Sequence, residues 1–257
     1  MKNYCHTHSY TKELDFGALR HIIVDDKSRI LYCFIPKVGS RTLKKVLAQL
    51  HGFKEDRANT VPVEKFWRRL SSYTENERSK RIQTYFKFLF VRDPINRLLS
   101  AYKDKFIGAS TCSIDAREKI IKSYRPQDFK PNGDNNVSFA EFIQYFSNND
   151  VLHNYHWLQY EKLCQPCVMN YDFIGHLENL EEDGPHLLKM AGIDDRVTFP
   201  PIHKSTGSHE VLEYYSQVPT RYIKRLGEQY RNDFEMFGYE YLGPVKELLK
   251  QSSSNDH

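Results

Sequence analysis

The fold of this 257-residue chain is indicated most directly by residues 30–42, which read Ile30-Leu31-Tyr32-Cys33-Phe34-Ile35-Pro36-Lys37-Val38-Gly39-Ser40-Arg41-Thr42. The first six of these residues are apolar on both faces, which is typical of a strand buried in the middle of a sheet. Residues 36–40 break the strand, and apolar residues then recur at helical spacing between residues 41 and 50. The sequence therefore predicts a strand, a loop and a helix in direct succession.

A second unit of the same kind follows further along the chain. Residues 85–91 read Tyr-Phe-Lys-Phe-Leu-Phe-Val and predict another buried strand. A helix is expected from about Pro94 to Phe106, with Asp93 as its N-cap and Pro94 at its first position. Two strand, loop and helix units in one chain indicate an α/β protein.

The remaining elements extend this pattern over the whole chain. Residues 22–24 predict a strand that a turn joins to the strand at 30–35, and residues 171–174 predict a further strand. Helices are expected at residues 64–73, 76–85, 138–146, 177–191, 210–215 and 220–237. The polar stretch 107–136, which contains Pro126, Pro131 and Gly133, predicts irregular structure.

Alternation of strands and helices predicts a parallel sheet covered by helices. We expect a single domain over residues 1–257, with flexible ends at 1–20 and 250–257. Hydrophobic residues make up 40% of the chain and charged residues 27%, as in ordinary soluble proteins. No apolar run is long enough to cross a bilayer and the N-terminus is no signal peptide, so we expect a membrane link only through an anchor outside this chain.

The loop at residues 36–42 carries the groups that a phosphate or sulfate needs. Gly39 lets the backbone approach a ligand closely, and the following helix N-terminus offers N–H groups and a positive dipole end. Lys37 and Arg41 add charge, while Ser40 and Thr42 add hydroxyl donors. The loop is not a Walker A motif, because its lysine precedes its glycine, and ATP hydrolysis is therefore disfavoured.

The second loop indicates a second anion site. Arg92 leaves the end of a strand and Ser100 lies two turns into the next helix, so a guanidinium and a hydroxyl are expected to grip one phosphate. Each residue also has a simpler interpretation, since Arg92 can pair with Asp93 and Ser100 can bond back to its own helix. Anion sites at the ends of two neighbouring strands suit a ligand with two distant phosphate-like groups.

At this point the chain resembles a known family. Residues 36–42 are similar to the 5′-phosphosulfate-binding loop of sulfotransferases that use 3′-phosphoadenosine-5′-phosphosulfate (PAPS). The segment FLFVRDPINRLLSAYKDKF, residues 88–106, resembles their 3′-phosphate-binding segment. The likeness is strongest to the Golgi carbohydrate sulfotransferases that modify chondroitin, dermatan and the HNK-1 glycan. Further matches follow in order at His156-Trp157, Leu163 to Cys167, Tyr171 to Gly175, Glu178, Leu180, Asp183, Phe199-Pro200, Lys204 to Thr206, Asp233-Phe234 and Phe237 to Tyr239.

The resemblance implies a sulfotransferase fold with P-loop-kinase-like architecture, a PAPS donor and adenosine 3′,5′-bisphosphate as product, without a metal. It also implies a glycan acceptor, of glycosaminoglycan type, rather than a nucleic acid, and a place in the Golgi lumen. Lys37 is expected at the leaving oxygen, where charge grows in the transition state. The residues expected to bind the donor are Lys37, Val38, Gly39, Ser40, Arg41, Thr42, Arg92, Ser100, Lys204 and Ser205.

The sequence offers several candidates for the catalytic base. Many relatives place a histidine between the first helix and the second strand, but residues 59–64 contain none. A general base should titrate near the working pH, which favours histidine. His156, beside Trp157, is our candidate, and its simpler interpretation is a packed histidine. The alternative candidates are His153, His51 and Glu64.

The five cysteines allow several interpretations. His153, His156, Cys164 and Cys167 have spacings that suggest zinc, but the family offers no precedent for it. The pair Cys164 and Cys167 suggests a redox site, but it precedes a strand, whereas thioredoxin-like sites open a helix. The Golgi setting that the resemblance implies favours structural disulfides. The sequon at residues 136–138 fits a glycoprotein of that compartment.

Two other functions compete with sulfuryl transfer. A nucleotide kinase with an atypical phosphate loop would need Mg²⁺ and an acidic residue after a strand, and the sequence shows no convincing one. A non-catalytic module that binds sulfated polysaccharide would use basic residues such as Lys103 and Lys105. Such a module would not need paired nucleotide loops. A net charge of +4 agrees with any of these anionic ligands.

Overall fold

The structure is a computed structural model that describes residues 1–8, 10, 13–53, 67–107, 114–131, 133, 135–148, 154–201 and 208–252. The chain forms two compact units, which are described separately below. The first comprises Met1–Arg92 with Leu158–Lys204, and the second comprises Asp93–Trp157 with Ser205–His257. Our expectation of one domain over the whole chain stays a prediction.

The first unit contains a five-stranded sheet in the order β3-β1-β2-β4-β5. Strands β2, β4 and β5 are parallel, whereas β1 runs antiparallel to β2 and β3 antiparallel to β1. We expected a parallel sheet, and the mixed sheet corrects this. A connection as short as residues 26–29 can only reverse the chain, since a parallel pair needs a long crossover. The strands are β1 (Ile22–Asp25), β2 (Ile30–Cys33), β3 (Arg68–Arg69), β4 (Phe86–Val91) and β5 (Phe173–His176).

The register of the parallel strands aligns their carboxyl ends. Tyr32 of β2 pairs with Phe88 of β4, and Val91 of β4 pairs with His176 of β5. All four residues of β2 and all but the first of β4 are buried, as the apolar runs predict. The loops after β2, β4 and β5 therefore begin at the same edge of the sheet.

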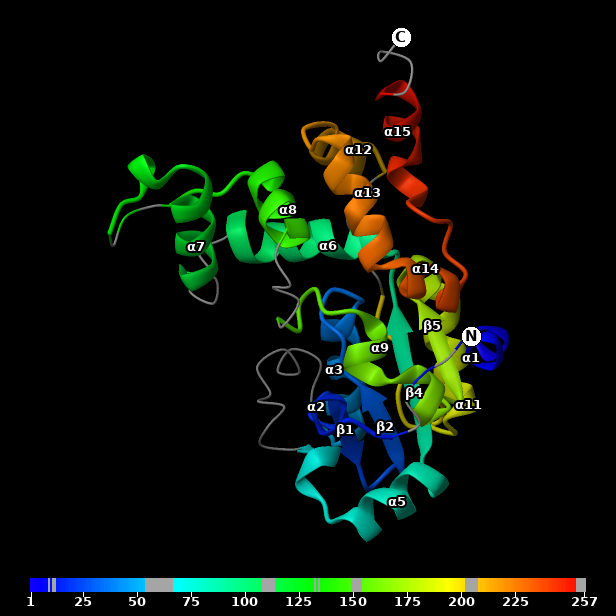
Figure 1. Cartoon of the computed structure of the whole chain (residues 1–257). Coiled ribbons are helices and arrows are strands. Elements are labelled where there is room, and N and C mark those ends of the chain that lie inside the picture. Colours follow the sequence, from blue (N-terminus) through cyan, green and yellow to red (C-terminus); the bar gives the residue numbers. More distant parts are fainter. Residues whose placement is uncertain are drawn as a thin grey trace. The chain divides into compact units, whose positions relative to one another are not determined.

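The helices of the first unit confirm the expected helices at 41–50, 76–85 and 177–191. In Figure 1, α5 lies at the end of the sheet where β4 begins, opposite the edge from which these loops leave. The helices are α1 (Lys2–Thr7), α2 (Phe16–Leu19), α3 (Ser40–Leu50), η1 (Leu70–Ser72), α5 (Glu75–Thr84), α9 (Tyr160–Cys164), α10 (Pro166–Met169), η5 (Leu177–Asn179) and α11 (Leu180–Met190).

The expected helix at 64–73 is wrong over its described part. Residues 68–69 form the short strand β3, and only Leu70–Ser72 turn as a 3-10 helix. Arg69 pairs with Ile23 of β1, whose edge would otherwise expose unpaired backbone groups. Pairing with a distant strand has overridden the local helical pattern.

Two disulfides tie distant parts of the first unit together. Cys5 of α1 bonds to Cys167 of α10, and Cys33 at the end of β2 bonds to Cys164 of α9. Residues 1–20, for which we expect flexibility, thus include two short helices and a covalent link. Since Cys164 and Cys167 bond to these other partners, they are neither a redox pair nor thiolate ligands for zinc.

The second unit is helical and confirms the expected helices at 94–106, 138–146 and 210–215. None of its helices, nor any other in the described part of the chain, is long and apolar enough to cross a bilayer. Its elements are α6 (Pro94–Tyr102), the π-helical turn η2 (Lys103–Ile107), α7 (Ile114–Tyr124), η4 (Pro126–Asp128), α8 (Phe139–Asn148), α12 (Ser208–Ser216), α13 (Thr220–Gln229), α14 (Arg231–Phe237), η6 (Gly243–Val245) and α15 (Lys246–Ser252).

Three features of this unit differ from expectation. The stretch 107–136 is not irregular throughout, because it contains α7, which buries Ile120 and Ile121. The expected helix at 220–237 is interrupted at Tyr230, between α13 and α14. The chain is also helical beyond residue 250, to the end of α15. Tertiary burial of a few apolar side chains suffices to order α7, although its sequence is mostly polar.

Aromatic side chains fill the core of the second unit. Phe142 packs against Phe106 and Phe146, with ring centroids 4.9 and 5.9 Å apart. Trp157 stands at right angles to Phe146 and is 4% exposed. Such clusters bury large areas in preferred ring geometries, which explains why the chain is rich in Phe and Tyr.

Candidate functional site

The loop between β2 and α3 has the geometry of an anion site. Gly39 is the N-cap of α3 and adopts the left-handed conformation, with φ of 79°. The first backbone bond of the helix runs from the N–H of Leu43 to the carbonyl of Gly39, at 3.2 Å. The N–H groups of the first helical turn therefore point toward the loop, where an anion can accept hydrogen bonds.

Two independent constraints require glycine at position 39. A side chain in the left-handed region is strained, and a Cβ atom there would lie 3.0 Å from Leu177 Cδ1 and 3.2 Å from Leu180 Cδ2. Val38 is fully buried beside it. The loop is thus packed against η5 and the start of α11, and a Cβ at position 39 would force these two leucine side chains to shift.

Lys37 also holds a left-handed backbone, with φ of 72°. This conformation costs a non-glycine residue about 1–2 kcal/mol, and strain of this kind gathers at functional sites. The side chains of Lys37, Ser40 and Thr42 are half-buried and that of Arg41 is exposed. The structure therefore gathers the predicted donor-binding residues of this loop around one helix N-terminus.

Arg92 follows β4, the strand next to β2, and is 5% exposed. The hydroxyl of Tyr160 holds its backbone: it accepts a hydrogen bond from the Arg92 N–H at 3.0 Å and donates one to the Arg92 carbonyl at 2.7 Å. Because β2 and β4 are parallel neighbours, Arg92 and the loop at 36–42 lie at the same edge of the sheet. Nothing in the sequence pointed to Tyr160, which is 68 residues away.

Ser100 and its helix belong to the second unit. Asp93 caps α6 by accepting a hydrogen bond from the Asn96 N–H at 2.9 Å, and Pro94 occupies the first turn, as the sequence predicts. Ser100 is half-buried, and Arg97 on the same helix is 2% exposed. Since Arg92 lies in the first unit, its expected joint role with Ser100 stays a prediction.

His156 lies in a tight turn of the second unit and is 8% exposed. The turn closes through a hydrogen bond from the Trp157 N–H to the Asn154 carbonyl, at 3.1 Å. The side-chain oxygen of Asn154 lies 2.7 Å from Nδ1 of His156 and accepts the His156 N–H at 3.0 Å. Asn154 is a second contact that the sequence did not reveal.

The alternative bases fare differently. His51 stands just past the C-terminal end of α3, roughly 16 Å along the helix from its first turn. There its Nε2 lies 3.2 Å from both Trp67 Nε1 and Asp25 Oδ1, in a structural network away from the loop. Glu64 and His153 lie outside the described residues, as do Lys204, Ser205 and Thr206.

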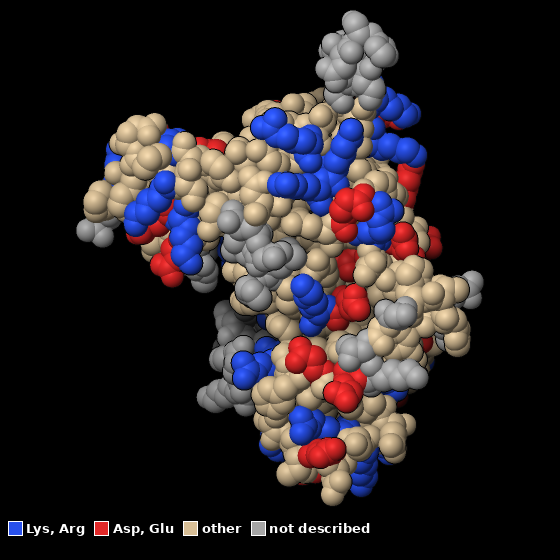
Figure 2. Space-filling model, in the orientation of Figure 1, with Lys and Arg blue, Asp and Glu red and all other residues tan. Residues whose placement is uncertain are grey.

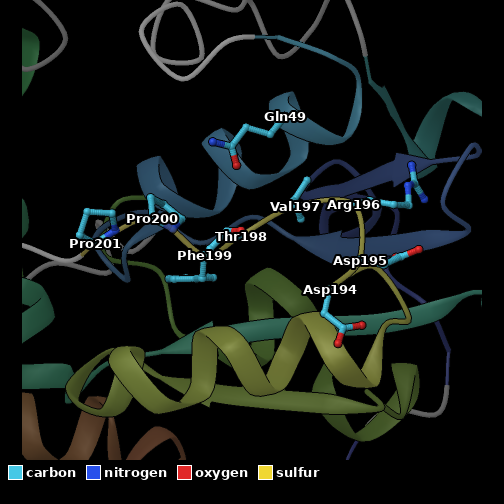
Figure 3. Close-up of a pocket in the computed structure, with 9 residues that line it drawn as sticks. All are labelled: Gln49, Asp194, Asp195, Arg196, Val197, Thr198, Phe199, Pro200 and Pro201. Atoms are coloured by element: carbon cyan, nitrogen blue, oxygen red, sulfur yellow. The ribbon is translucent and has the colours of Figure 1, made fainter.

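A hollow of about 450 Å³ lies elsewhere in the first unit. Figure 3 shows Gln49 pointing from α3 toward the segment Asp194–Pro201, which forms the rest of the wall. Phe199 packs on α11, where a Cβ on Gly184 would be 2.6 Å from its ring. None of the predicted donor-binding residues that the structure describes lines this hollow, and the two carboxylates of Asp194 and Asp195 beside the single cation of Arg196 make it unfavourable for an anion.

Comparison with known proteins agrees with this geometry. The sulfotransferase family matches residues 20–240. Carbohydrate sulfotransferase 10 of Homo sapiens is 38% identical over 93% of this chain and 71% of its own, and that of Gallus gallus is 37% identical over 86% and 67%. Carbohydrate sulfotransferase 14 of Danio rerio is 39% identical over 86% and 62%. No solved structure matches. This chain belongs to the sulfotransferase family.

Proposed function

We propose that this chain is a PAPS-dependent carbohydrate sulfotransferase that transfers a sulfuryl group to a hydroxyl of an acidic, glycosaminoglycan-like glycan. Family membership supports the reaction class, and the relatives named above support a carbohydrate acceptor. The observation that carries the proposal is the shared sheet edge, where the loop 36–42 and Arg92 follow two parallel neighbours.

The donor has two separated anionic groups, and the two loops match them. The 5′-phosphosulfate fits the N-terminus of α3, where Gly39 caps the helix and Ser40, Arg41 and Thr42 supply donors. This strand, glycine loop and helix is our basis for proposing a P-loop-kinase-like architecture. Arg92 is assigned to the 3′-phosphate, with Ser100 as the second donor.

Lys37 is assigned to the oxygen that leaves toward adenosine 3′,5′-bisphosphate. Sulfuryl transfer is an in-line displacement in which negative charge grows on this oxygen. A fixed ammonium group there stabilises the transition state more than the ground state. The left-handed backbone at Lys37 fixes the direction in which its side chain leaves the main chain, which supports this role.

His156 is assigned as the base that removes the proton of the acceptor hydroxyl. Imidazole titrates near neutral pH, and the ring is held in a closed turn rather than on a free loop. A histidine with only a packing role would be buried in the same way. The activity of His156→Ala distinguishes the two roles.

An exposed basic face supports an acidic acceptor. Arg221, Lys224 and Arg225 are exposed on one side of α13, and Figure 2 shows lysine and arginine side chains gathered over this helix. Such a face attracts sulfated or carboxylated chains through long-range electrostatics. Neutralising the three residues should raise the acceptor KM and weaken its dependence on salt.

The disulfides support a lumenal compartment, and we propose the Golgi lumen. Cys5–Cys167 and Cys33–Cys164 need an oxidising environment to form and persist. Chondroitin, dermatan and the HNK-1 glycan are the acceptors to test first, because the sequence resembles the enzymes that modify them.

The proposal is tested by calorimetric titration with adenosine 3′,5′-bisphosphate, followed by transfer of labelled sulfuryl from PAPS to these acceptors. We expect micromolar binding of the bisphosphate, weakened at least about tenfold in Arg92→Ala through loss of a charge-assisted contact. The matched control is Lys80→Ala, which removes an exposed cation from α5 at the opposite end of the sheet.

Each competing function predicts a different result. A nucleotide kinase would bind ATP with Mg²⁺ in preference to the bisphosphate. A polysaccharide-binding module would bind heparin but neither nucleotide. The two basic residues that we considered for such a module are paired with carboxylates: Lys103 with Glu210, and Lys105 with Asp104 at 3.2 Å.

A further inference from the structure

The turn that carries His156 is fixed at several points. The indole ring of Trp157 is buried among aromatic rings. The backbone carbonyl of Trp157 accepts a hydrogen bond from the hydroxyl of Tyr230. The buried guanidinium of Arg97 donates to the carbonyl of Tyr155, at 3.4 Å. Together with the closing bond between Trp157 and Asn154, these contacts hold the backbone of the turn in one conformation.

Within this turn, the Asn154 amide oxygen contacts two nitrogens of His156. The backbone N–H of His156 donates to it at 3.0 Å, and a backbone N–H can only donate. The amide atom that faces His156 is therefore the oxygen rather than the nitrogen, which settles the orientation of the amide. The same oxygen lies 2.7 Å from Nδ1 of the imidazole.

An oxygen acceptor at this distance fixes the position of the imidazole proton. Nδ1 must carry the hydrogen, since two acceptors facing each other at 2.7 Å would repel. In the neutral ring, the lone pair is then on Nε2. A ring held in this way has one basic nitrogen with a defined direction, as a general base requires.

We propose that Asn154 is a positioning residue, which holds His156 in the Nδ1–H tautomer so that Nε2 accepts the proton of the acceptor hydroxyl. This inference rests on the proposed function for its catalytic part, while the tautomer follows from the geometry alone. Other groups that contact the turn include the guanidinium of Arg97, the hydroxyl of Tyr230 and the ring of Tyr155, which is tilted over the imidazole with centroids 4.2 Å apart.

The tautomer is measured directly by long-range ¹H–¹⁵N NMR of protein labelled with ¹⁵N-histidine, with His156→Ala used to assign the signals. At a pH where the ring is neutral, we expect a pyrrole-type shift for Nδ1 and a pyridine-type shift for Nε2. In Asn154→Ala the fixed pattern should be lost. Asn154→Asp keeps an oxygen acceptor and should keep the Nδ1–H tautomer.

Kinetics then connect the tautomer with turnover. We expect kcat of Asn154→Ala to fall roughly tenfold to a hundredfold, as when other histidine-orienting partners are removed, with the bisphosphate Kd unchanged. Asn154→Asp should recover part of this loss. Asn135→Ala is the matched control, because the bonds of Asn135 to described residues lie within its own polar loop, and we expect the variant to alter neither property.

The outcomes separate the two levels of the inference. An Nε2–H tautomer in the wild-type protein overturns the proposal about Asn154. An Nδ1–H tautomer together with full activity in His156→Ala overturns the catalytic role and leaves Asn154 as a structural partner. Unchanged kcat in a folded Asn154→Ala that has lost the tautomer also overturns the positioning role.

Discussion

The Tyr160 hydroxyl bonds both backbone groups of Arg92, at 3.0 Å to the nitrogen and 2.7 Å to the oxygen. A side chain from α9 thus stands in for a neighbouring strand at the point where β4 ends. The contact fixes the backbone of Arg92, whose side chain is proposed to bind the 3′-phosphate. The contact connects the Cys164 disulfide region of the first unit with one half of the proposed donor site.

Tyr160→Phe is expected to lower both stability and nucleotide affinity. It leaves a buried N–H and a buried carbonyl without their partner, at a cost of roughly 1–3 kcal/mol. Tyr171→Phe is the matched control, because the Tyr171 hydroxyl donates to a single carbonyl, that of Cys164, at 2.8 Å. Urea unfolding and calorimetry should show that both variants lose stability and that only Tyr160→Phe loses bisphosphate affinity.

Gly39→Ala should abolish donor binding, and Gly52→Ala supplies its control. Both glycines have similar φ values, 79° and 82°, so both variants should lose about 1 kcal/mol of stability to backbone strain. Only at Gly39 does a Cβ also meet Leu177 and Leu180, whereas at Gly52 no atom of the described residues lies within 4 Å of a Cβ. Equal bisphosphate affinities in the two variants would contradict our account of the loop.

Lys37→Ala should impair turnover far more than binding. Removing one group that stabilises developing charge lowers kcat by about 10²–10³-fold. Because this interaction grows only in the transition state, the bisphosphate Kd should change much less. A parallel loss of kcat and affinity would assign Lys37 to ground-state binding instead. Steady-state kinetics beside calorimetry distinguish the two, with Lys80→Ala as control.

The two disulfides should each contribute about 2–4 kcal/mol, because they close loops with sequence separations of 162 and 131 residues. Peptide mapping without reduction should recover Cys5 with Cys167 and Cys33 with Cys164. Replacing the second pair with serine should also reduce bisphosphate affinity, since Cys33 ends the strand that leads into the loop 36–42. If the serine variants of both pairs bind the bisphosphate equally well, the Cys33–Cys164 disulfide has no particular influence on the donor site.

Asp26 should make stability depend on acidic pH. Burial acts to raise the pKa of Asp26, but hydrogen bonds from Arg81, Tyr85 and Tyr73 outweigh it and lower the pKa to about 2 from 3.8. A lowered folded pKa gives stability that is present above the unfolded value and is lost as pH falls from 3.8 toward 2.

The prediction compares Asp26→Asn with wild type by urea unfolding. The wild-type advantage should be constant above about pH 5 and should shrink as the pH falls toward 2. The matched control is Asp195→Asn, which makes the same substitution at another exposed aspartate. An advantage for wild-type Asp26 that persists at pH 2 would show that the carboxylate network is not its source.

The sequence predicts those parts of the site that are local. Strand β2, the glycine loop and helix α3 follow directly from an apolar run, a break and a helical repeat. The same holds for β4, the Asp93 cap and α6. In each case one short stretch contains both the pattern and the residues that carry the chemistry, so no distant contact is needed to recognise them.

The tertiary structure decided everything that depends on contacts between distant segments. It placed Tyr160 on Arg92, paired the cysteines, added Arg68–Arg69 to the edge of β1 and ordered α7 where the sequence suggested irregular structure. Periodicity reports only which face of a segment is apolar. Which segment covers that face, and which side chain satisfies a backbone group at a strand end, is settled by the burial that the folded chain achieves as a whole.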